Sequence, residues 1–262
     1  MRNLSEFQAP VDFLLTDIDD TLTDEGRLHG AAYEALWSLH AAGVKVVPIT
    51  GRPAGWCEMI ARMWPVAGVV GENGGFWFRH HQQKMRRDYF LDPKTIAENR
   101  RKLDALAQEI PKKVPGSAIA SDQFCRQMDL AIDFCEDVPA LPANEVQKIV
   151  RLFEEAGAQA KVSSIHVNGW FGTYDKLTMT LRFLESQFGL TADDARKKCA
   201  FSGDSPNDEP MFQFFPNSFG VANISDFASS LKHPPRFAAD RRGGEGFVQI
   251  AKRLLETRSC PF

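Results

Sequence analysis

Short apolar runs alternate with segments of helical spacing through the N-terminal part of this chain, and this alternation limits the possible folds more than any other feature. The apolar runs at 11–15, 44–49 and 67–70 have the length and composition of buried strands. The segment at 31–42 places alanine and leucine at helical spacing before Gly43, and a second helical segment lies between the later two runs. Strands and helices that alternate through short turns predict a parallel sheet with crossover helices.

This alternation stops after Gly75 and resumes near residue 176. The stretch between predicts a strand pair, a polar helix, and then further strands around one helix, at 76–78, 88–90, 93–110, 119–122, 126–134, 143–156, 158–164 and 165–171. The resumed alternation predicts strands and helices at 176–188, 199–203, 209–215, 219–222, 236–239 and 247–256. We therefore predict an α/β fold. Residues 1–80 and 171–262 form a Rossmann-like parallel sheet core with helices on both faces, and residues 81–170 form a smaller inserted α/β domain.

The composition describes a folded chain without an excess of positive charge. Hydrophobic residues make up 44% and charged residues 25%, and 31 Lys and Arg oppose 34 Asp and Glu for a formal charge of −3. A chain with this balance can bury a core, so disorder is excluded, and coating of nucleic acid loses its electrostatic basis. Each apolar run is far shorter than the roughly 18 residues of a membrane-spanning helix. We expect no nucleic acid and no membrane among the partners.

The cysteines and the N-terminal residues bear on the compartment. The cysteines are odd in number and form no Cys-x-x-Cys pair, which fits reduced thiols better than a disulfide framework or a zinc site. They are Cys57, Cys125, Cys135, Cys199 and Cys260. The first residues include no apolar stretch of the kind that signal peptides carry. These features predict a cytoplasmic protein, whereas nothing in the sequence predicts its oligomeric state.

Acidic residues follow the first predicted strand directly. In the segment 17–21, Asp17 and Asp19 project to the same side while the chain stays extended, because side chains in a strand alternate with period two. Two carboxylates this close repel each other unless a proton or a divalent cation lies between them. Oxygen ligands of this hardness suit Mg²⁺. The segment therefore predicts a magnesium site at the carboxyl edge of the sheet, where open α/β sheets bind ligands.

Two further strand ends and one helix start add polar groups to the same edge. The segment 203–208 follows a predicted strand and offers the carboxylates of Asp204 and Asp208. Thr50 ends another strand, where its hydroxyl and the backbone amides after it can bind an anion, and Lys176 opens the first helix after the insertion. Each of these, taken alone, is as readily a turn, a helix cap or a surface lysine. Their common place at one sheet edge favours a function.

The order of these motifs resembles that of the haloacid dehalogenase (HAD) superfamily. Its four motifs correspond here to Asp17-x-Asp19-x-Thr21, Thr50, Lys176 and Gly203-Asp204-x-x-Asn207-Asp208. The insertion resembles the α/β cap domain of the sugar-phosphatase branch, which includes sucrose-phosphate, trehalose-phosphate and mannosyl-3-phosphoglycerate phosphatases and phosphomannomutase. The turn Gly71-Glu72-Asn73-Gly74 is typical of that branch. The likeness covers essentially the whole chain. Asp20 stands where many relatives have glycine, which is a common variant within the superfamily.

The resemblance implies a role for each acidic residue. Asp17 would be the nucleophile that forms an aspartyl-phosphate, and Asp19 would protonate the leaving group and later activate water. Mg²⁺ would be held by Asp17, by the backbone carbonyl of Asp19 and by Asp204. Asp208 would orient this metal site more than bind the ion directly, with support from Asn207.

The resemblance also implies how the substrate is held. Thr50 and Lys176 would hold and neutralise the oxygens of the transferring phosphoryl group. A closing cap expels water and admits a small phosphorylated metabolite, a sugar phosphate above all. Candidate substrate-binding residues are Arg126, Asp129, His166 and Asn168 in the insertion and Arg52, Glu72, Asn73 and Asn207 in the core. Any one of them is as readily a solvent-facing or packing residue.

One stretch of the chain has a strong local charge. Residues 79–113 contain ten Lys and Arg against five Asp and Glu. Such a stretch is able to attract an anionic substrate, but a solvated helix face is the interpretation that we favour.

We therefore predict a Mg²⁺-dependent phosphatase that hydrolyses a small phosphorylated metabolite. A phosphomutase of the phosphomannomutase type is one alternative, because it shares the nucleophile and the cap. A non-catalytic sensor of a phosphorylated ligand is the other, and the presence of both Asp17 and Asp19 argues against it.

Overall fold

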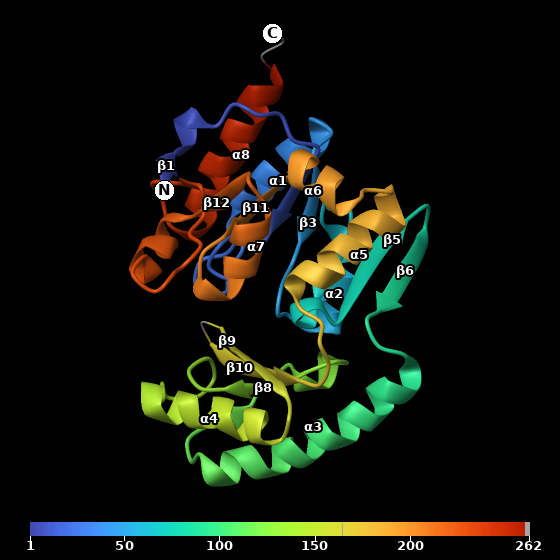
Figure 1. Cartoon of the computed structure of the whole chain (residues 1–262), viewed down its shortest axis with the longest axis vertical. Helices are drawn as coiled ribbons and strands as arrows, with labels where there is room; N and C mark the ends of the chain where they lie inside the picture. The colour runs from blue at the N-terminus through green and yellow to red at the C-terminus, as the bar shows by residue number, and fades with distance from the viewer. Residues whose placement is uncertain (164, 260–262) are drawn as a thin grey trace.

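A six-stranded parallel sheet forms the core of the protein. The computed structural model describes residues 1–163 and 165–259. The strands of the sheet are β1 Arg2–Asn3, β2 Phe13–Thr16, β3 Lys45–Pro48, β11 Cys199–Gly203, β12 Ser218–Gly220 and β13 Phe237–Ala238. Their order is β1-β13-β12-β11-β2-β3, and every pairing is parallel (Figure 1). The strand β2 therefore lies between β11 and β3, and the carboxyl ends of these three strands are neighbours.

Helices cover both faces of this sheet. They are α1 Gly30–Ala41, α2 Ala54–Met63, α5 Lys176–Phe188, α6 Ala192–Lys198, α7 Glu209–Phe214 and α8 Gly243–Ser259. In β2, Leu14 packs in the apolar cluster with α1, α2 and α8, whereas Phe13 and Leu15 pack in the cluster with α5, α6 and α7. Successive strand residues point to opposite faces, so one strand serves both clusters. The predicted Rossmann-like core with helices on both faces is confirmed.

The strand predicted at 67–70 lies parallel to the end of β3 and also begins a second, antiparallel sheet. Val70 of the strand β4 (Val69–Gly71) forms a parallel bridge with Ile49, the residue that follows β3. On its other side, β4 pairs antiparallel with β5 (Phe76–His81). In turn β5 pairs with β6 (Lys84–Tyr89), which completes a three-stranded sheet. The third strand therefore has the predicted parallel direction, and the tight turn after β4 adds an antiparallel extension to it.

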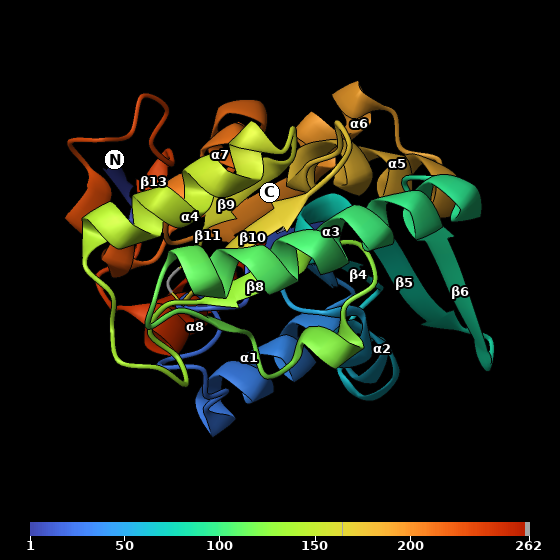
Figure 2. The same cartoon turned by 90° about the horizontal axis from the view of Figure 1, so that it is seen from below.

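The inserted residues form a second α/β layer below the core. Its elements are α3 Pro93–Lys113, β7 Ala118–Ile119, β8 Leu130–Asp133, α4 Ala143–Glu155, β9 Gln159–Val162 and β10 His166–Trp170. The sheet has the order β7-β8-β10-β9 and is antiparallel. The helices α3 and α4 cover its outer face, as Figure 2 shows from below, and the other face lies toward the core. The predicted α/β cap is confirmed.

Two cap strands are shorter than predicted. The segment 119–122 contains only the last residue of β7, and β8 occupies only the later part of the segment 126–134. The residues between these strands include the turn η3 (Gln123–Cys125). The remaining 3₁₀ elements are η1 Leu4–Glu6, η2 Glu72–Gly74, η4 Pro206–Asp208 and η5 Ala222–Phe227. The apolar alternation of 126–134 did not mark the strand end, because β8 is buried on both faces.

The division of the chain at residues 80 and 170 remains a prediction. The strand β5 continues past the first of these positions and pairs with β6, which lies beyond it. Cys260 and the last residue of the strand predicted at 158–164 lie outside the described residues. Within 1–163 and 165–259, none of the helices combines the length and the apolar character that crossing a membrane requires.

Candidate active site

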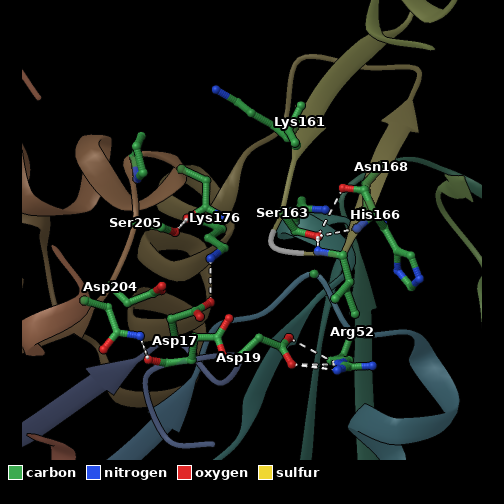
Figure 3. Close-up of a pocket in the computed structure, with 18 of the residues that line it drawn as sticks. Asp17, Asp19, Arg52, Lys161, Ser163, His166, Asn168, Lys176, Asp204 and Ser205 are labelled. Carbon is green, nitrogen blue, oxygen red and sulfur yellow. Dashed lines mark hydrogen bonds and ion pairs between the residues drawn. The ribbon is translucent and has the colours of Figure 1, made fainter. Parts of the chain in front are cut away.

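Three carboxylates meet at the carboxyl edge of the core sheet. Asp17 follows β2 and Asp204 follows β11, and the register of these strands lets the Asp17 N–H donate to the Ser202 carbonyl at 2.9 Å. Asp208 comes from the η4 turn. One carboxylate oxygen of each of the three acidic residues lies within 4.8 Å of the others, and all three side chains are buried. Figure 3 shows Asp17 and Asp204 at this edge.

Lys176 lies among these carboxylates. It is the first residue of α5, and the Asp175 side chain caps that helix. The Lys176 ammonium donates to Asp17 Oδ1 at 2.7 Å and to Asp208 Oδ1 at 2.9 Å. Burial alone would lower the pKa of Lys176, but the charges of Asp17 and Asp208 raise it above its ordinary value. The lysine is therefore charged, and Asp208 Oδ2 is occupied as well, because it accepts the Asp204 N–H at 3.2 Å.

The cluster carries more negative charge than Lys176 neutralises. Burial, followed by repulsion from Asp208 and Asp17, raises the pKa of Asp204 to about 9. Burial also raises the pKa of Asp17 to about 7, with Lys176 opposing the rise and neighbouring carboxylates adding to it. These carboxyls resist ionisation because the site lacks positive charge. A divalent cation with oxygen ligands supplies that charge, so the donor set fits Mg²⁺.

The Asp19 side chain turns toward Arg52 (Figure 3). Nε and Nη2 of Arg52 donate to both carboxylate oxygens at 2.7 to 3.1 Å, which is a bidentate pair. The guanidinium also lies over the Trp56 ring, 4.6 Å from its centroid. On the cap side, Arg52 Nη1 is 3.7 Å from Glu136. Arg52 thus holds Asp19 in one orientation beside the cavity.

The loop after β3 lies behind the same cavity. The buried Thr50 hydroxyl accepts the Arg52 N–H at 3.0 Å, and the Thr50 carbonyl accepts the Asn73 N–H at 3.1 Å. Gly51 lines the cavity, and a Cβ there would lie 3.3 Å from the Asn73 amide. The loop is therefore packed closely against Asn73, and at Gly51 it presents backbone without a side chain to the cavity.

Asp20 occupies a backbone conformation that explains the glycine of many relatives. Its φ of 57° lies in the left-handed region, where glycine carries no steric cost. The Asp20 carbonyl accepts from Asn223 Nδ2 at 3.1 Å, which holds the turn in place.

A cavity of about 440 Å³ lies between the acidic cluster and the cap. Predicted site residues from both layers line it, namely Asp17, Asp19, Arg52, Asn73, Lys176, Asp204 and Asn207 from the core and Arg126, His166 and Asn168 from the cap. Within the cavity wall, the Asn207 side-chain oxygen accepts from the Ser205 hydroxyl at 3.0 Å. Thr50 and Asp208 stand behind the wall through the contacts described above. The tertiary structure therefore brings the two sides of the predicted cleft together.

Two buried polar atoms of the cavity wall lack a partner among the described residues. They are Asn73 Nδ2 and His166 Nε2. The His166 Nε2 atom lies 2.9 Å from a Glu136 carboxylate oxygen, but not in hydrogen-bond geometry. Burial, and then the charge of Arg126, lower the pKa of His166 to about 4, so its ring is neutral near pH 7. An unpaired buried polar atom is costly, so Asn73 Nδ2, which has no such neighbour, points to a bound polar ligand.

Arg126 connects the cap to the loop after β3. Its Nη1 donates to the Gly51 carbonyl at 2.9 Å and to Asp129 Oδ1 at 3.1 Å, and its Nε donates to Asp122 at 3.1 Å. Asn168 Nδ2 donates to Asp129 Oδ2 at 3.0 Å. Asp129, a predicted substrate-binding candidate, is fully buried and instead holds Arg126 and Asn168.

The prediction that Glu72 binds substrate was wrong. Its side chain is fully buried, and its carboxylate accepts from backbone amides instead of lining the cavity. The basic stretch 79–113 does not line the cavity either, because it forms β6 and the outer helix α3. The favoured interpretation of that stretch, a solvated helix face, agrees with its position.

Sequence reasoning missed several residues of the cavity wall. Lys161 and Ser163 belong to β9 and the turn after it, and Lys161 extends over the cavity in Figure 3. The signal available was their place on the same predicted strand pair as His166. Phe227 and Arg242 line the cavity from the core side. They follow β12 and β13, whose carboxyl ends share the ligand-binding edge.

Comparison with known proteins agrees with this geometry. The family model for haloacid dehalogenase-like hydrolases matches residues 14–111. The predicted resemblance to the haloacid dehalogenase superfamily is confirmed. This hydrolase is also similar along nearly its whole length to proteins named phosphoglycolate phosphatase. The one from Methanospirillum hungatei is 28% identical over 248 residues, which cover 91% of this chain and 94% of that protein. The one from Methanothrix thermoacetophila is 25% identical and covers 93% and 97%.

Solved structures share the fold of this hydrolase. The crystal structure of Thermoplasma acidophilum 0175 superposes with a TM-score of 0.72 at 21% identity and covers 95% of this chain and 99% of that one. The sucrose-phosphatase of Synechocystis, solved in complex with sucrose and phosphate, gives 0.63 at 15% identity, with coverage of 97% and 98%. The family match and the phosphatase relatives confirm the predicted enzyme class, which is a phosphatase of the HAD type.

Proposed function

We propose that this hydrolase is a Mg²⁺-dependent phosphatase that releases phosphate from a small phosphorylated metabolite, a sugar phosphate in the first place, through an aspartyl-phosphate on Asp17. The observation that carries the proposal is the position of Asp17. Its Oδ1 is held by Lys176, and it lies in a three-carboxylate cluster at the wall of a cavity that the cap covers.

The chemistry assigned to Asp17 follows from this position. With Oδ1 held by Lys176, the carboxylate attacks the phosphorus, and the bond from phosphorus to the leaving oxygen breaks. Water then hydrolyses the aspartyl-phosphate. The Lys176 ammonium neutralises the phosphoryl oxygens, and the backbone after Thr50 binds them. Asp17, Asp204 and the Asp19 carbonyl would hold Mg²⁺, oriented by Asp208. The bound ion supplies the positive charge that screens a carboxylate from an anionic phosphoryl group.

Asp19 is the residue to which we assign proton transfer in both steps. Its carboxyl lines the cavity beside Asp17, and the guanidinium fork of Arg52 holds its orientation. It gives a proton to the leaving oxygen and takes one from the attacking water.

The cavity supports a small substrate with polar groups beyond the phosphate. Its volume of about 440 Å³ suits a metabolite and not a folded phosphoprotein. Asn73 Nδ2 and His166 Nε2 offer unpaired polar atoms to the substrate's hydroxyl or carboxylate groups. The names of the relatives support phosphoglycolate as a further candidate, which is a smaller substrate than a sugar phosphate.

A phosphate-release assay tests the proposal. Purified protein is offered a panel of sugar phosphates and phosphoglycolate with Mg²⁺, and the same panel with EDTA. We expect release from at least one compound with Mg²⁺ and loss of release with EDTA and in Asp17→Asn. Absence of phosphate release from every compound of the panel, or turnover by Asp17→Asn, would falsify the proposal. Isomerisation of a sugar phosphate that a sugar bisphosphate stimulates would identify a phosphomutase, and binding without turnover would identify a sensor.

A further inference from the structure

Glu72 occupies an unusual place between the core and the cap. It begins the η2 turn after β4, where Glu72 and Asn73 have φ values of 43° and 55° and Gly74 has a φ of 104°. Three consecutive residues with positive φ are uncommon, and a non-glycine residue is strained in this conformation. Such a turn persists only where its surroundings hold it. Here the turn is held by the backbone amides that donate to the Glu72 carboxylate.

The Glu72 carboxylate accepts hydrogen bonds from both layers. On the core side it accepts the Ala54 N–H at the start of α2, at 2.9 Å. On the cap side it accepts the N–H groups of three consecutive residues, with Gln127 at 2.9 and 3.0 Å, Met128 in a short contact, and Asp129 at 3.1 Å. One buried carboxylate thereby joins α2 to the segment that leads into β8.

That segment carries the cap residues which face the phosphate side of the cavity. Arg126 comes directly before the three residues whose amides bind Glu72, and it donates to the Gly51 carbonyl. Asp129 is the last of those three residues, and its carboxylate accepts from both Arg126 and Asn168. The segment also packs tightly on the η2 turn, because a Cβ at Gly75 would lie 2.7 Å from Met128 Cβ. The places of Arg126 and Asn168 in the cavity therefore depend on the segment that Glu72 binds.

We infer that Glu72 is a positioning residue that locks the segment Arg126–Asp129 against the core and so sets where the cap's Arg126 and Asn168 meet the substrate. Glu72 itself touches no part of the cavity. This inference rests on the proposed function for its consequence in catalysis, but the amide contacts are testable without any activity.

The test is Glu72→Gln, examined by two measurements. The glutamine side chain has nearly the same shape, but its NH₂ turns a donor toward backbone donors. Hydrogen–deuterium exchange should therefore speed up about tenfold or more at the amides of residues 127–129. In the phosphate-release assay, KM for the most active sugar phosphate should rise about tenfold more than KM for acetyl phosphate, because the small acetyl group needs less of the cap.

Control variants separate positioning from general stability. Glu34→Gln removes the same charge from an exposed position on α1 and should match the wild type in both measurements. Glu72→Asp keeps the charge and should restore part of the protection at residues 127–129. Unchanged exchange in Glu72→Gln, or an equal loss on both substrates, overturns the inference. Loss of folding in both Glu72 variants assigns the residue to stability alone and overturns it as well. Absence of turnover in the wild type would defeat the proposed function, while the exchange result would still decide the role of Glu72.

Discussion

The Lys176 ammonium lies 2.7 Å from Asp17 Oδ1, although the two residues are separated by 159 positions in the chain. The whole inserted cap lies between them in sequence. The contact forms because α5 begins beside the carboxyl end of β2, directly after the chain returns from the cap. The same return passes the η2 turn, since Gly74 packs against the Asp175 carbonyl. The charge balance of the active site is therefore set at the junction of the core and the cap.

Replacement of this lysine should affect both activity and stability. Lys176→Met removes the ammonium that bonds both Asp17 and Asp208 and leaves their buried carboxylates without it. We expect kcat for phosphate release to fall by about 10²–10³-fold or more. Unpairing the buried carboxylates should lower the free energy of unfolding by about 3 kcal/mol in metal-free buffer, as measured by urea denaturation. Lys113→Met, at an exposed position, is the matched control. A variant that keeps a tenth of the wild-type kcat would contradict this role.

Stability of the metal-free protein should fall as the pH rises. The unfolded chain releases the protons of Asp17 and Asp204 near the ordinary pKa of 3.8, whereas the folded protein holds them up to about 7 and about 9. Because the folded state then binds more protons, the free energy of unfolding decreases with pH across this window. Mg²⁺ favours the ionised carboxylates, so its stabilising effect should grow with pH.

Thermal unfolding at pH 5 and at pH 8.5, with Mg²⁺ or with EDTA, checks this linkage. We expect the Mg²⁺-induced rise in Tm to be larger at pH 8.5. Asp204→Asn removes one of the two groups and should flatten the fall of the metal-free Tm. A larger Mg²⁺ effect at pH 5 would rule out the raised pKa values.

Arg52 should be more sensitive to lysine substitution than an ordinary surface arginine. Arg52→Lys keeps the charge but loses the fork that holds both oxygens of Asp19. Loss of that orientation should lower kcat about tenfold to a hundredfold, with a smaller effect on KM. Arg62→Lys, on the exposed side of α2, provides the control. Equal kcat values for the two variants would remove Arg52 from the positioning of Asp19.

His166 should contribute a neutral hydrogen bond to substrate. Loss of one such bond in His166→Ala should raise KM for the preferred substrate about tenfold. Because burial lowers the pKa of His166 to about 4, the ring gains its charge only in acid. The KM ratio between His166→Ala and the wild type should therefore stay constant from pH 6 to 8. His233→Ala, at an exposed position, is the control. A KM ratio that changes tenfold across this range would show that the ring titrates there.

The core of the site was predictable because it depends on strand ends. Asp17, Thr50 and Asp204 each follow a strand of the core, and parallel strands present their carboxyl ends at one edge whatever the rest of the chain does. Lys176 opens a helix that the apolar spacing marks with the bounds that the structure shows. Short-range patterns were sufficient for these positions.

The cap and the junction were less predictable. Glu72 lies within the turn 71–74 that the sequence marks, but a carboxylate has the same appearance in sequence whether it faces a ligand or backbone amides. Its direction depends on the η2 turn and on residues 127–129, which are brought there by pairings far along the chain. Lys161 and Ser163 reach the cavity only because β9 pairs with β10 in one particular register.

By itself, the sequence determined that this chain builds a parallel α/β core with an inserted cap and places acidic residues at the ligand-binding edge, because the spacing of apolar residues and the period of a strand are local properties. Only the tertiary structure decided which polar side chains face the cavity and which hold the backbone, because that choice depends on register and on contacts between distant segments.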